Sequence, residues 1–243
     1  LFRSRHGSQS PAYGSIVASG PNACVLHYVE NDRQMQHGEL ILIDAGCELD
    51  GYASDITRSF PVNGRFNAAQ KDVYEIVLAA QEAAFAATAP GRHFMEAHDA
   101  AVRVLTQGLI DLKLLAGSVD GLIESEAYKP YYMHRTGHWI GMDVHDCGSY
   151  VEPGEADAAL QRTDPISGEV IIQRPSRILR AGMCTTIEPG LYLRASADLP
   201  EAFHNIGIRI EDDVIVTDNG CELLTRDVPV KVDEIEALMR DLA

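Results

Sequence analysis

The sequence predicts an α+β protein with two lobes, because each half of the chain combines short strand-like runs with at least one helical segment. The 243 residues suffice for one large domain with a substantial core. Hydrophobic residues make up 46% of the chain and charged residues 23%, which is ordinary for a globular protein. We therefore expect a single domain over 1–243, with a first lobe at about 13–116 and a second at about 130–243.

The first half is expected to place strands before helices. Residues 13–30 are expected to form short strands around a Gly-Pro-Asn turn, and residues 40–60 to form a β-hairpin. Asn67 is a candidate N-cap for an alanine-rich helix, which Pro90 and Gly91 end. Two further helices are expected at about 94–115 and 119–128.

The second half opens with a histidine-rich segment at 129–148. The polar stretch 152–176, rich in proline and glycine, is expected to be a loop. Strand-like runs follow at 181–193 and 206–217, and the chain closes with a helix at 232–243.

Two carboxylates interrupt the apolar runs of the expected hairpin. If Asp50 and Gly51 form a two-residue type I′ turn, residue 44 faces residue 57 across the hairpin. Because side chains alternate between faces, Asp44 and Asp55 then lie on one face as diagonal neighbours, with Cβ atoms roughly 7–8 Å apart. Two carboxylates at that distance can converge on ions between them.

The run 206–217 carries a second such pattern. Three isoleucines share one face, which we expect to be core, while the opposite face carries a cation and a carboxylate. The residues of that opposite face are Gly207, Arg209 and Glu211. Because glycine has no side chain, this face is expected to leave room for a ligand.

The strand carboxylates raise a charge problem. Taken singly, each is more simply explained as a solvent-facing group or a member of an ion pair. Several buried carboxylates together are costly, and two divalent cations with a bridging hydroxide would remove that cost. The four strand carboxylates are Asp44, Asp55, Glu188 and Glu211. Beside a histidine-rich segment, the four together favour a metal site.

The histidine-rich segment contains His134 and His138, which are four residues apart and therefore share one face of either a strand or a helix. His145 follows seven residues later. This spacing alone is a weak metal signal, and His27 is ambiguous by itself. The remaining histidines are interpreted as surface or core residues, and His98 as a solvated residue of a helix.

Charge and cysteine content exclude several partner classes. The net charge is −16, which argues against nucleic acid and anionic membranes and favours cationic ligands. No apolar run approaches the length of a membrane span. The five cysteines are dispersed and odd in number, which favours free thiols and a cytoplasmic location.

Five short motifs carry a resemblance to a known family. They are LIDAG with Asp44, SDITRSF with Asp55, HRTGHWIG with His138, TIEPGLY with Glu188 and GIRIEDD with Glu211. In this order they resemble the pita-bread metallopeptidases, and within them the aminopeptidase P (Xaa-Pro aminopeptidase) group. The resemblance runs from about Tyr13 to the C-terminus. It implies the pita-bread (creatinase/aminopeptidase) fold, with two pseudo-symmetric lobes of antiparallel sheet covered by helices.

The resemblance also implies a metal centre and a reaction. Two divalent ions, with Mn²⁺ expected and Zn²⁺ or Co²⁺ as alternatives, would share Asp55 and Glu211 as bridges. Asp44 would bind one ion, while His138 and Glu188 bind the other. A bridging hydroxide would attack the peptide bond between an N-terminal residue and a following proline, and Glu188 would carry the proton to the leaving nitrogen.

Further residues match the family's substrate pocket. By this resemblance His134 and His145 act as catalytic residues that bind substrate and stabilise the developing charge. His27, Tyr192 and Arg209 line the pocket, although Arg209 could instead only orient Glu211. The expected substrate is a peptide with proline in second position, and the expected assembly is a homo-oligomer.

The chain departs from the family pattern in three ways. Arg135 stands where members often have glycine, and 152–176 is longer than expected. The family's usual N-terminal domain is expected to be absent from this chain. The readings left open are a prolidase acting on Xaa-Pro dipeptides, a methionine aminopeptidase, and a non-catalytic binding module on the same fold.

Overall fold

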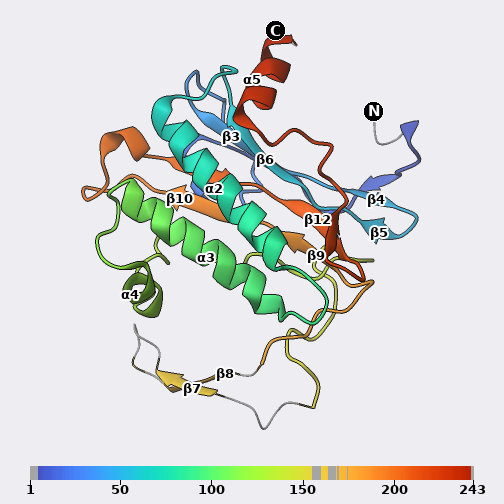
Figure 1. The fold of residues 1–243 in the computed structure, drawn as a ribbon. Helices are drawn as coiled ribbons and strands as arrows, with labels where there is room; N and C mark the ends of the chain where they lie inside the picture. Colours follow the sequence, from blue (N-terminus) through green and yellow to red (C-terminus); the bar gives the residue numbers. More distant parts are fainter. Residues whose placement is uncertain (1–4, 155–159, 164–167, 169, 174, 242–243) are drawn as a thin grey trace.

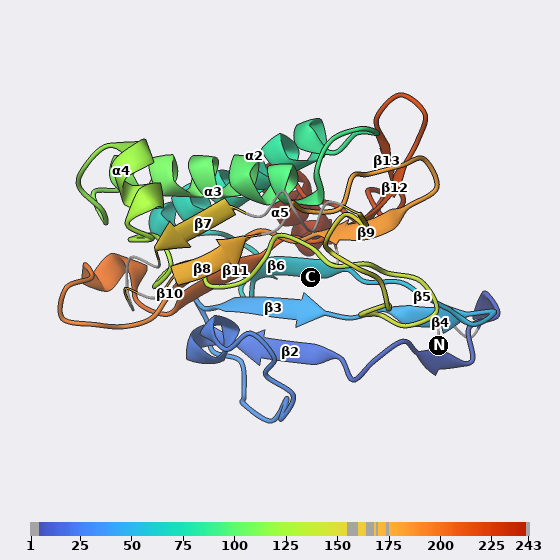
Figure 2. The ribbon, with the colours of Figure 1, turned by 90° about the horizontal axis from the view of Figure 1, so that it is seen from below.

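Helices cover one face of the strands, which gives the molecule a helical layer over a β layer (Figure 1; Figure 2). The structure, a computed structural model, describes residues 5–154, 160–163, 168, 170–173 and 175–241. None of the helices in this part of the chain has the length and hydropathy needed to cross a membrane. The helices are α2 (Ala68–Ala87), α3 (Phe94–Asp111), α4 (Val119–Glu124) and α5 (Val232–Asp241). The predicted α+β class is confirmed.

The first long helix begins where the sequence predicts. The Asn67 side chain accepts a hydrogen bond from the Gln70 N–H at 2.9 Å, and the Gln70 side chain accepts one from the Asn67 N–H at 3.0 Å, which forms a capping box. The next helix, α3, ends earlier than predicted, because Lys113 adopts a left-handed backbone with φ of 60°. Helix α4 likewise stops at Glu124 rather than at residue 128.

The predicted hairpin is present in the predicted register. Strand β3 (Leu40–Asp44) pairs antiparallel with β6 (Thr57–Pro61), and Asp44 faces Thr57. At the tip, β4 (Cys47–Leu49) pairs with β5 (Tyr52–Ala53). Asp50 and Gly51 have φ values of 51° and 85°, as a type I′ turn requires. The turn therefore sets which residues of the hairpin share a face.

Residues 13–30 form fewer strands than predicted. Only β2 (Ile16–Ser19) is a strand, and it joins β3 and β6 in the order β2-β3-β6. The Gly-Pro-Asn stretch forms a 3₁₀ helix, η1 (Gly20–Cys24), and residues 25–30 contain no strand. The short β1 (Ser10–Pro11) instead pairs with β4 at the hairpin tip.

The second half supplies two more antiparallel sheets. Strands β9 (Cys184–Ile187), β12 (Asp212–Val216) and β13 (Cys221–Leu223) are ordered β13-β12-β9. Strand β10 (Gly190–Leu193) pairs with β11 (Ile206–Arg209), and a short 3₁₀ helix, η3 (Glu201–Phe203), lies between them. The runs predicted as strands are thus confirmed.

The stretch 152–176 is not simply a loop. Its described part contains a two-stranded antiparallel hairpin of β7 (Leu160–Thr163) and β8 (Val170–Gln173), drawn apart from the main sheets in Figure 1. The rest of this prediction falls partly on 155–159, 164–167, 169 and 174, which lie outside the described residues. The proline and glycine content of this stretch indicated turns, but it did not predict the short strands between them.

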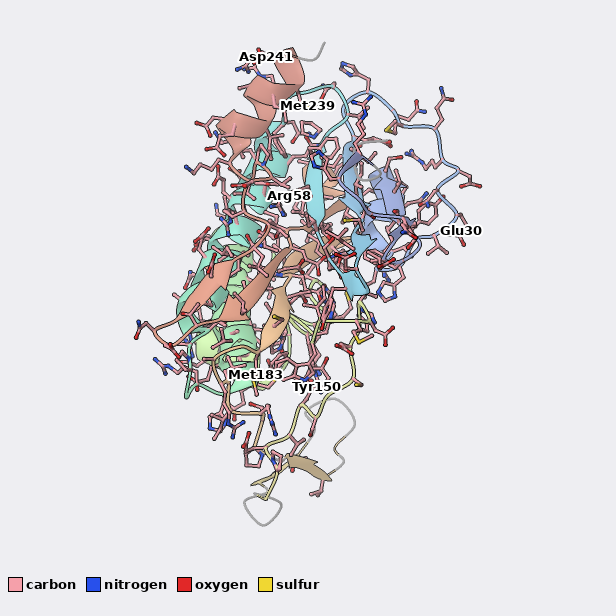
Figure 3. All side chains as sticks on the ribbon, turned by 90° about the vertical axis from the view of Figure 1, so that its right-hand side faces the viewer. Glu30, Arg58, Tyr150, Met183, Met239 and Asp241 are labelled. Atoms are coloured by element: carbon pink, nitrogen blue, oxygen red, sulfur yellow. The ribbon has the colours of Figure 1, made fainter. Side chains whose placement is uncertain are left out.

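The two halves of the chain meet at β6 and β12. Arg58 of β6, labelled in Figure 3, is buried and donates to the Glu211 carbonyl oxygen at 2.6 Å and to the Asp212 carboxylate at 2.7 Å. A β-bridge also links Thr57 to Glu211. This junction brings the end of the hairpin against the Glu211 strand, although the two lie some 150 residues apart in the chain.

One expectation about β11 is wrong. The face of Ile206, Ile208 and Ile210 is buried in the main core, as predicted. The opposite face does not leave room for a ligand at Gly207, because a Cβ there would lie 2.2 Å from the Ala23 carbonyl oxygen. Glycine is instead required for the close approach of the η1 backbone to β11.

Candidate metal centre

Four of the five predicted ligands come from points where strands begin or end, and His138 comes from a segment that is not a strand. Asp44 is the last residue of β3, and Asp55 lies two residues before β6. Glu188 directly follows β9, and Glu211 lies between β11 and β12. His138 lies on a segment beside β9, and its carbonyl oxygen accepts a hydrogen bond from the β9 backbone at 2.9 Å. The fold thus delivers each side chain from a fixed backbone position.

Four of these side chains converge on one point. Nε2 of His138 lies 3.5 Å from Asp55 Oδ2 and 3.7 Å from Glu188 Oε1. The same nitrogen lies 4.0 Å from Glu211 Oε1. One ligand atom each from Asp55, His138 and Glu211 lies within 4.8 Å of the others, a spacing that can hold a metal ion.

Asp44 joins the cluster through two partners. The Tyr13 hydroxyl lies 2.5 Å from Asp44 Oδ1 and also contacts Asp55 Oδ1. On the other side, Arg209 Nη2 donates to Asp44 Oδ2 at 2.6 Å. Because a phenol carries one proton, Tyr13 can donate to only one of the two carboxylates at a time. The contact of one hydroxyl with both carboxylates shows that Asp44 and Asp55 lie side by side, as the hairpin register predicts.

The cluster is deeply buried and strongly acidic. Asp44, Asp55 and Glu211 are only 8%, 5% and 1% exposed. Burial raises the pKa of Glu188 to about 7, although His138 and Arg209 oppose this effect. Burial, and then the charges of Asp55 and Glu188, hold the pKa of Glu211 well above its usual range. Protons are thus held here because the carboxylates cannot all ionise together without positive charge.

The donor set fits divalent cations. The four carboxylates can carry four negative charges, and Arg209 offers one guanidinium to Asp44. Carboxylate oxygens with one imidazole are the ligands that hard or borderline divalent ions such as Mn²⁺ accept. Asp44, Asp55, His138, Glu188 and Glu211 could therefore hold metal.

The predicted substrate residues lie in the same cavity, whose volume is about 340 Å³. His27, His134, His145 and Arg209 all line it beside the acidic cluster. The His145 ring lies 4.3 Å from the His138 ring and 6.4 Å from the His27 ring, centroid to centroid. Tyr192 is the exception, because it is fully buried and does not line the cavity; it reaches the site only through its hydroxyl, which lies 3.2 Å from Arg209 Nη1.

His134 has both ring nitrogens engaged. Nδ1 lies 2.8 Å from the Arg135 carbonyl oxygen, and Nε2 lies 2.8 Å from the Tyr192 hydroxyl. Because a carbonyl oxygen only accepts, Nδ1 carries the proton and Nε2 accepts from Tyr192. Burial and the nearby Arg209 lower the pKa of His134 to about 3, so the ring is neutral.

Arg209 does not orient Glu211 directly, which was one of its two expected roles. Its side chain bonds to Asp44 rather than to Glu211, and Nε donates to the Thr57 hydroxyl at 3.3 Å. The Thr57 hydroxyl in turn donates to Glu211 Oε2 at 2.5 Å. Arg209 therefore reaches Glu211 only through Thr57, while its charge-assisted bond holds Asp44.

Several residues of the site could not be found from the sequence. Tyr13 lies outside every motif, and Thr57 lies within SDITRSF but was assigned no role, because the importance of both depends on contacts made across the fold. Asp213 accepts a hydrogen bond from the Asp55 N–H at 3.0 Å, and burial raises its pKa to about 7. Its place beside Glu211 and Asp212 in a run of three acids was the one available signal.

His98 is not a solvated surface residue. Its Nδ1 lies 2.9 Å from the Thr136 hydroxyl, and its ring packs 5.9 Å from the Tyr132 ring. Burial, followed by the charge of Arg135, lowers the pKa of His98 to about 4. This neutral histidine of α3 supports the segment that carries His134 and His138.

Comparison with known proteins identifies the class to which this fold and site belong. The model of metallopeptidase family M24 matches residues 1–218. The chain therefore belongs to metallopeptidase family M24, and its antiparallel sheets covered by helices form the pita-bread fold.

The names of individual similar proteins are more specific than the family name. The chain is 48% identical over 235 residues to an Xaa-Pro aminopeptidase of Haemophilus influenzae, which covers 97% of this chain and 50% of the relative. It is 40% identical over 257 residues to a human Xaa-Pro dipeptidase, which covers 97% of this chain and 50% of that protein. The chain thus spans about half the length of these curated relatives.

Solved structures of aminopeptidases are similar to this chain as well. Aminopeptidase PepP of Pseudomonas aeruginosa superposes with a TM-score of 0.88 at 55% identity, over 98% of this chain and 50% of that one. An alanine variant of Escherichia coli aminopeptidase P, solved in complex with substrate, gives a TM-score of 0.87 at 46% identity. That match covers 98% of this chain and 49% of the other.

Proposed function

We propose that this chain is the catalytic domain of an Xaa-Pro aminopeptidase, which hydrolyses the bond between an N-terminal residue and a following proline. One observation carries the proposal: four carboxylates and His138 line one cavity together with the residues expected to bind substrate. The names of the similar aminopeptidases support the same activity.

The proposed cofactor is a pair of divalent ions, with Mn²⁺ expected. Asp55 and Glu211 would bind both ions, Asp44 would bind one, and His138 and Glu188 the other. Bound ions of this kind polarise a carbonyl and make an attacking water more acidic. The buried carboxylates, whose pKa values are raised, are the groups whose charge such ions would offset.

Glu188 is the proposed proton carrier. Burial raises the pKa of Glu188 to about 7, which supports proton exchange near neutral pH. It would accept a proton from the attacking water and deliver it to the proline nitrogen as the peptide bond breaks. His138 and Arg209, which oppose the rise in its pKa, keep the ionised form accessible.

His134 and His145 are the proposed partners of the substrate carbonyl. Neutral His134 uses Nε2 to accept from Tyr192, so it must exchange this bond, and its tautomer, before it can donate to substrate. Burial and the neighbouring His138 lower the pKa of His145. Both imidazoles would therefore act as neutral hydrogen-bond donors. His27 lines the same cavity.

A peptide panel tests the proposal. We expect the Mn²⁺-loaded chain to release the first residue of Xaa-Pro-Yaa peptides, to leave Xaa-Ala-Yaa controls intact, and to lose activity when a chelator removes the metal. Absence of cleavage of every proline peptide with Mn²⁺ present would contradict the proposal. The 40% identity to the human Xaa-Pro dipeptidase supports a second candidate, and exclusive cleavage of Xaa-Pro dipeptides would favour it.

Location and assembly are proposals as well. The five cysteines are all free thiols, which supports a cytoplasmic location. The proposed assembly is a homo-oligomer, as the family resemblance implies. Cell fractionation tests the first point and light scattering tests the second.

A further inference from the structure

Two guanidinium groups line the cavity, and only one of them is engaged by an acidic group of the site. Arg209 is buried and bonds to Asp44 and to the Tyr192 hydroxyl. Arg135 is exposed, and no carboxylate of the described residues lies within ion-pair distance of it. Arg135 is therefore free to bind an anion brought by a ligand.

The backbone and an aromatic ring fix where Arg135 stands. Its carbonyl oxygen accepts the hydrogen bond from His134 Nδ1, so its peptide is tied to a predicted catalytic residue. Its guanidinium carbon lies 5.6 Å from the centre of the Tyr150 ring, a distance at which the ring face attracts and orients the cation. Figure 3 places Tyr150 on the looped segment between the central strands and the β7–β8 hairpin.

Arg135 also stands where two hollows meet. Together with His134 and Tyr150 it lines both the metal cavity and a larger neighbouring hollow of about 850 Å³. A peptide whose first residue lies against the acidic cluster must extend its remaining residues away from it. Because Arg135 lies where the metal cavity meets the neighbouring hollow, the extended part of such a peptide would pass beside it.

Charge determines which end of a peptide belongs at this rim. The net charge of −16, which two divalent ions would reduce only to −12, attracts an N-terminal ammonium and repels a C-terminal carboxylate. A short peptide brings both charges into the site together. Its carboxylate therefore needs a cation placed away from the cluster, and Arg135 offers a planar donor that can bind a carboxylate through two nitrogens.

We propose that Arg135 is a specificity-determining residue that binds the free C-terminal carboxylate of short Xaa-Pro-Yaa peptides. This inference rests on the proposed Xaa-Pro aminopeptidase activity and names the substrates that the site prefers. Peptides that end close to the scissile bond in a free carboxylate are favoured over the same peptides with a neutral end.

A matched pair of substrates tests the proposal. One Xaa-Pro-Yaa peptide is supplied as the free acid and as the C-terminal amide to the Mn²⁺-loaded wild type and to R135Q, R135K and R92Q. Arg92 is an exposed arginine paired with Glu96, so R92Q controls for the loss of one surface charge. We expect the wild type to prefer the acid by about fivefold in kcat/KM, as a partly exposed charge pair allows.

The variants should separate binding from chemistry. R135Q should lose the preference through a higher KM for the acid with kcat unchanged, and its kcat/KM for the amide should stay at the wild-type value. R135K should keep part of the preference, and R92Q all of it. Added salt should reduce the preference of the wild type but not that of R135Q, because the contact is partly exposed.

The outcomes distinguish this inference from the proposed function. Equal kcat/KM for acid and amide in the wild type, or an undiminished preference in R135Q, would overturn the role of Arg135 and leave the aminopeptidase activity standing. If the wild type cleaves neither peptide, the proposed function fails and the role of Arg135 fails with it.

Discussion

Glu211 is the residue that the proposed metal site places between both ions. It is 1% exposed, accepts from the Thr57 hydroxyl, and lies 4.0 Å from His138 Nε2. Burial and three other carboxylates keep its pKa high. The side chain is therefore unfavourable to ionise until a cation arrives, which is the behaviour expected of a ligand that binds both ions.

The Glu211→Gln variant tests this role. We expect it to lose metal binding and at least about 100-fold in activity, because the amide keeps the shape but not the charge of a bridging ligand. Its metal-free form should be at least as stable as the wild type, because one buried acid has been removed. Equilibrium dialysis with Mn²⁺, activity and thermal unfolding measure these three effects.

The exposed Glu222 of β13 provides the matched control. Glu222→Gln removes the same charge from the surface and should leave metal binding, activity and melting temperature unchanged. If Glu211→Gln binds Mn²⁺ as tightly as Glu222→Gln does, Glu211 is not a ligand.

Among the elements, the hairpin and the first long helix were readable from local signals. Asp50 and Gly51 fix the turn, the turn fixes the register, and the register places Asp44 opposite Thr57. The capping box at Asn67 likewise lies within four residues of sequence. Such signals are contained in the element itself, so no knowledge of the rest of the fold is needed.

Other features depend on contacts between distant segments, and the sequence could not show them. Gly207 was expected to face a ligand, but the backbone of η1 occupies that space. His98 was expected in solvent, but the segment of Thr136 covers it. Tyr13 reaches the site from outside every motif. The ligand set was thus suggested by local patterns and a family resemblance, while the residues that hold it were not.

The close packing of η1 on β11 makes a prediction at the same scale. Gly207→Ala should lower the free energy of unfolding by about 1–3 kcal/mol, because the new methyl group would overlap the Ala23 carbonyl oxygen. Arg209 should move with β11, so activity should fall as well. Gly220→Ala is the control, since nothing lies within 4 Å of its Cβ position. Equal stability of the two variants in denaturant unfolding would contradict the packing described.

At the scale of the whole molecule, stability should depend on pH and metal together. In the metal-free chain the pKa of Glu188 is raised to about 7, so the folded state holds a proton that the unfolded state releases at lower pH. Stability is then fully present below the unfolded pKa, near 4.3, and is lost as pH rises through about 7. Glu211 acts in the same direction.

Thermal unfolding across pH checks this linkage. The metal-free chain should melt at lower temperature at pH 8 than at pH 5.5, and Mn²⁺ should raise the melting temperature more at pH 8, because protons no longer compete for the ligands. A metal-free melting temperature that rises over this range, or that Mn²⁺ leaves unchanged at pH 8, would show that the carboxylates are not buried together as described.

The decisive experiment on the proposed metal centre is a crystal structure of the chain grown with Mn²⁺, with anomalous scattering recorded from manganese. We expect two anomalous peaks in the cavity, each within coordinating distance of its share of Asp44, Asp55, His138, Glu188 and Glu211. A well-ordered site with no manganese in it, or with the ions bound to other side chains, would refute the dinuclear centre.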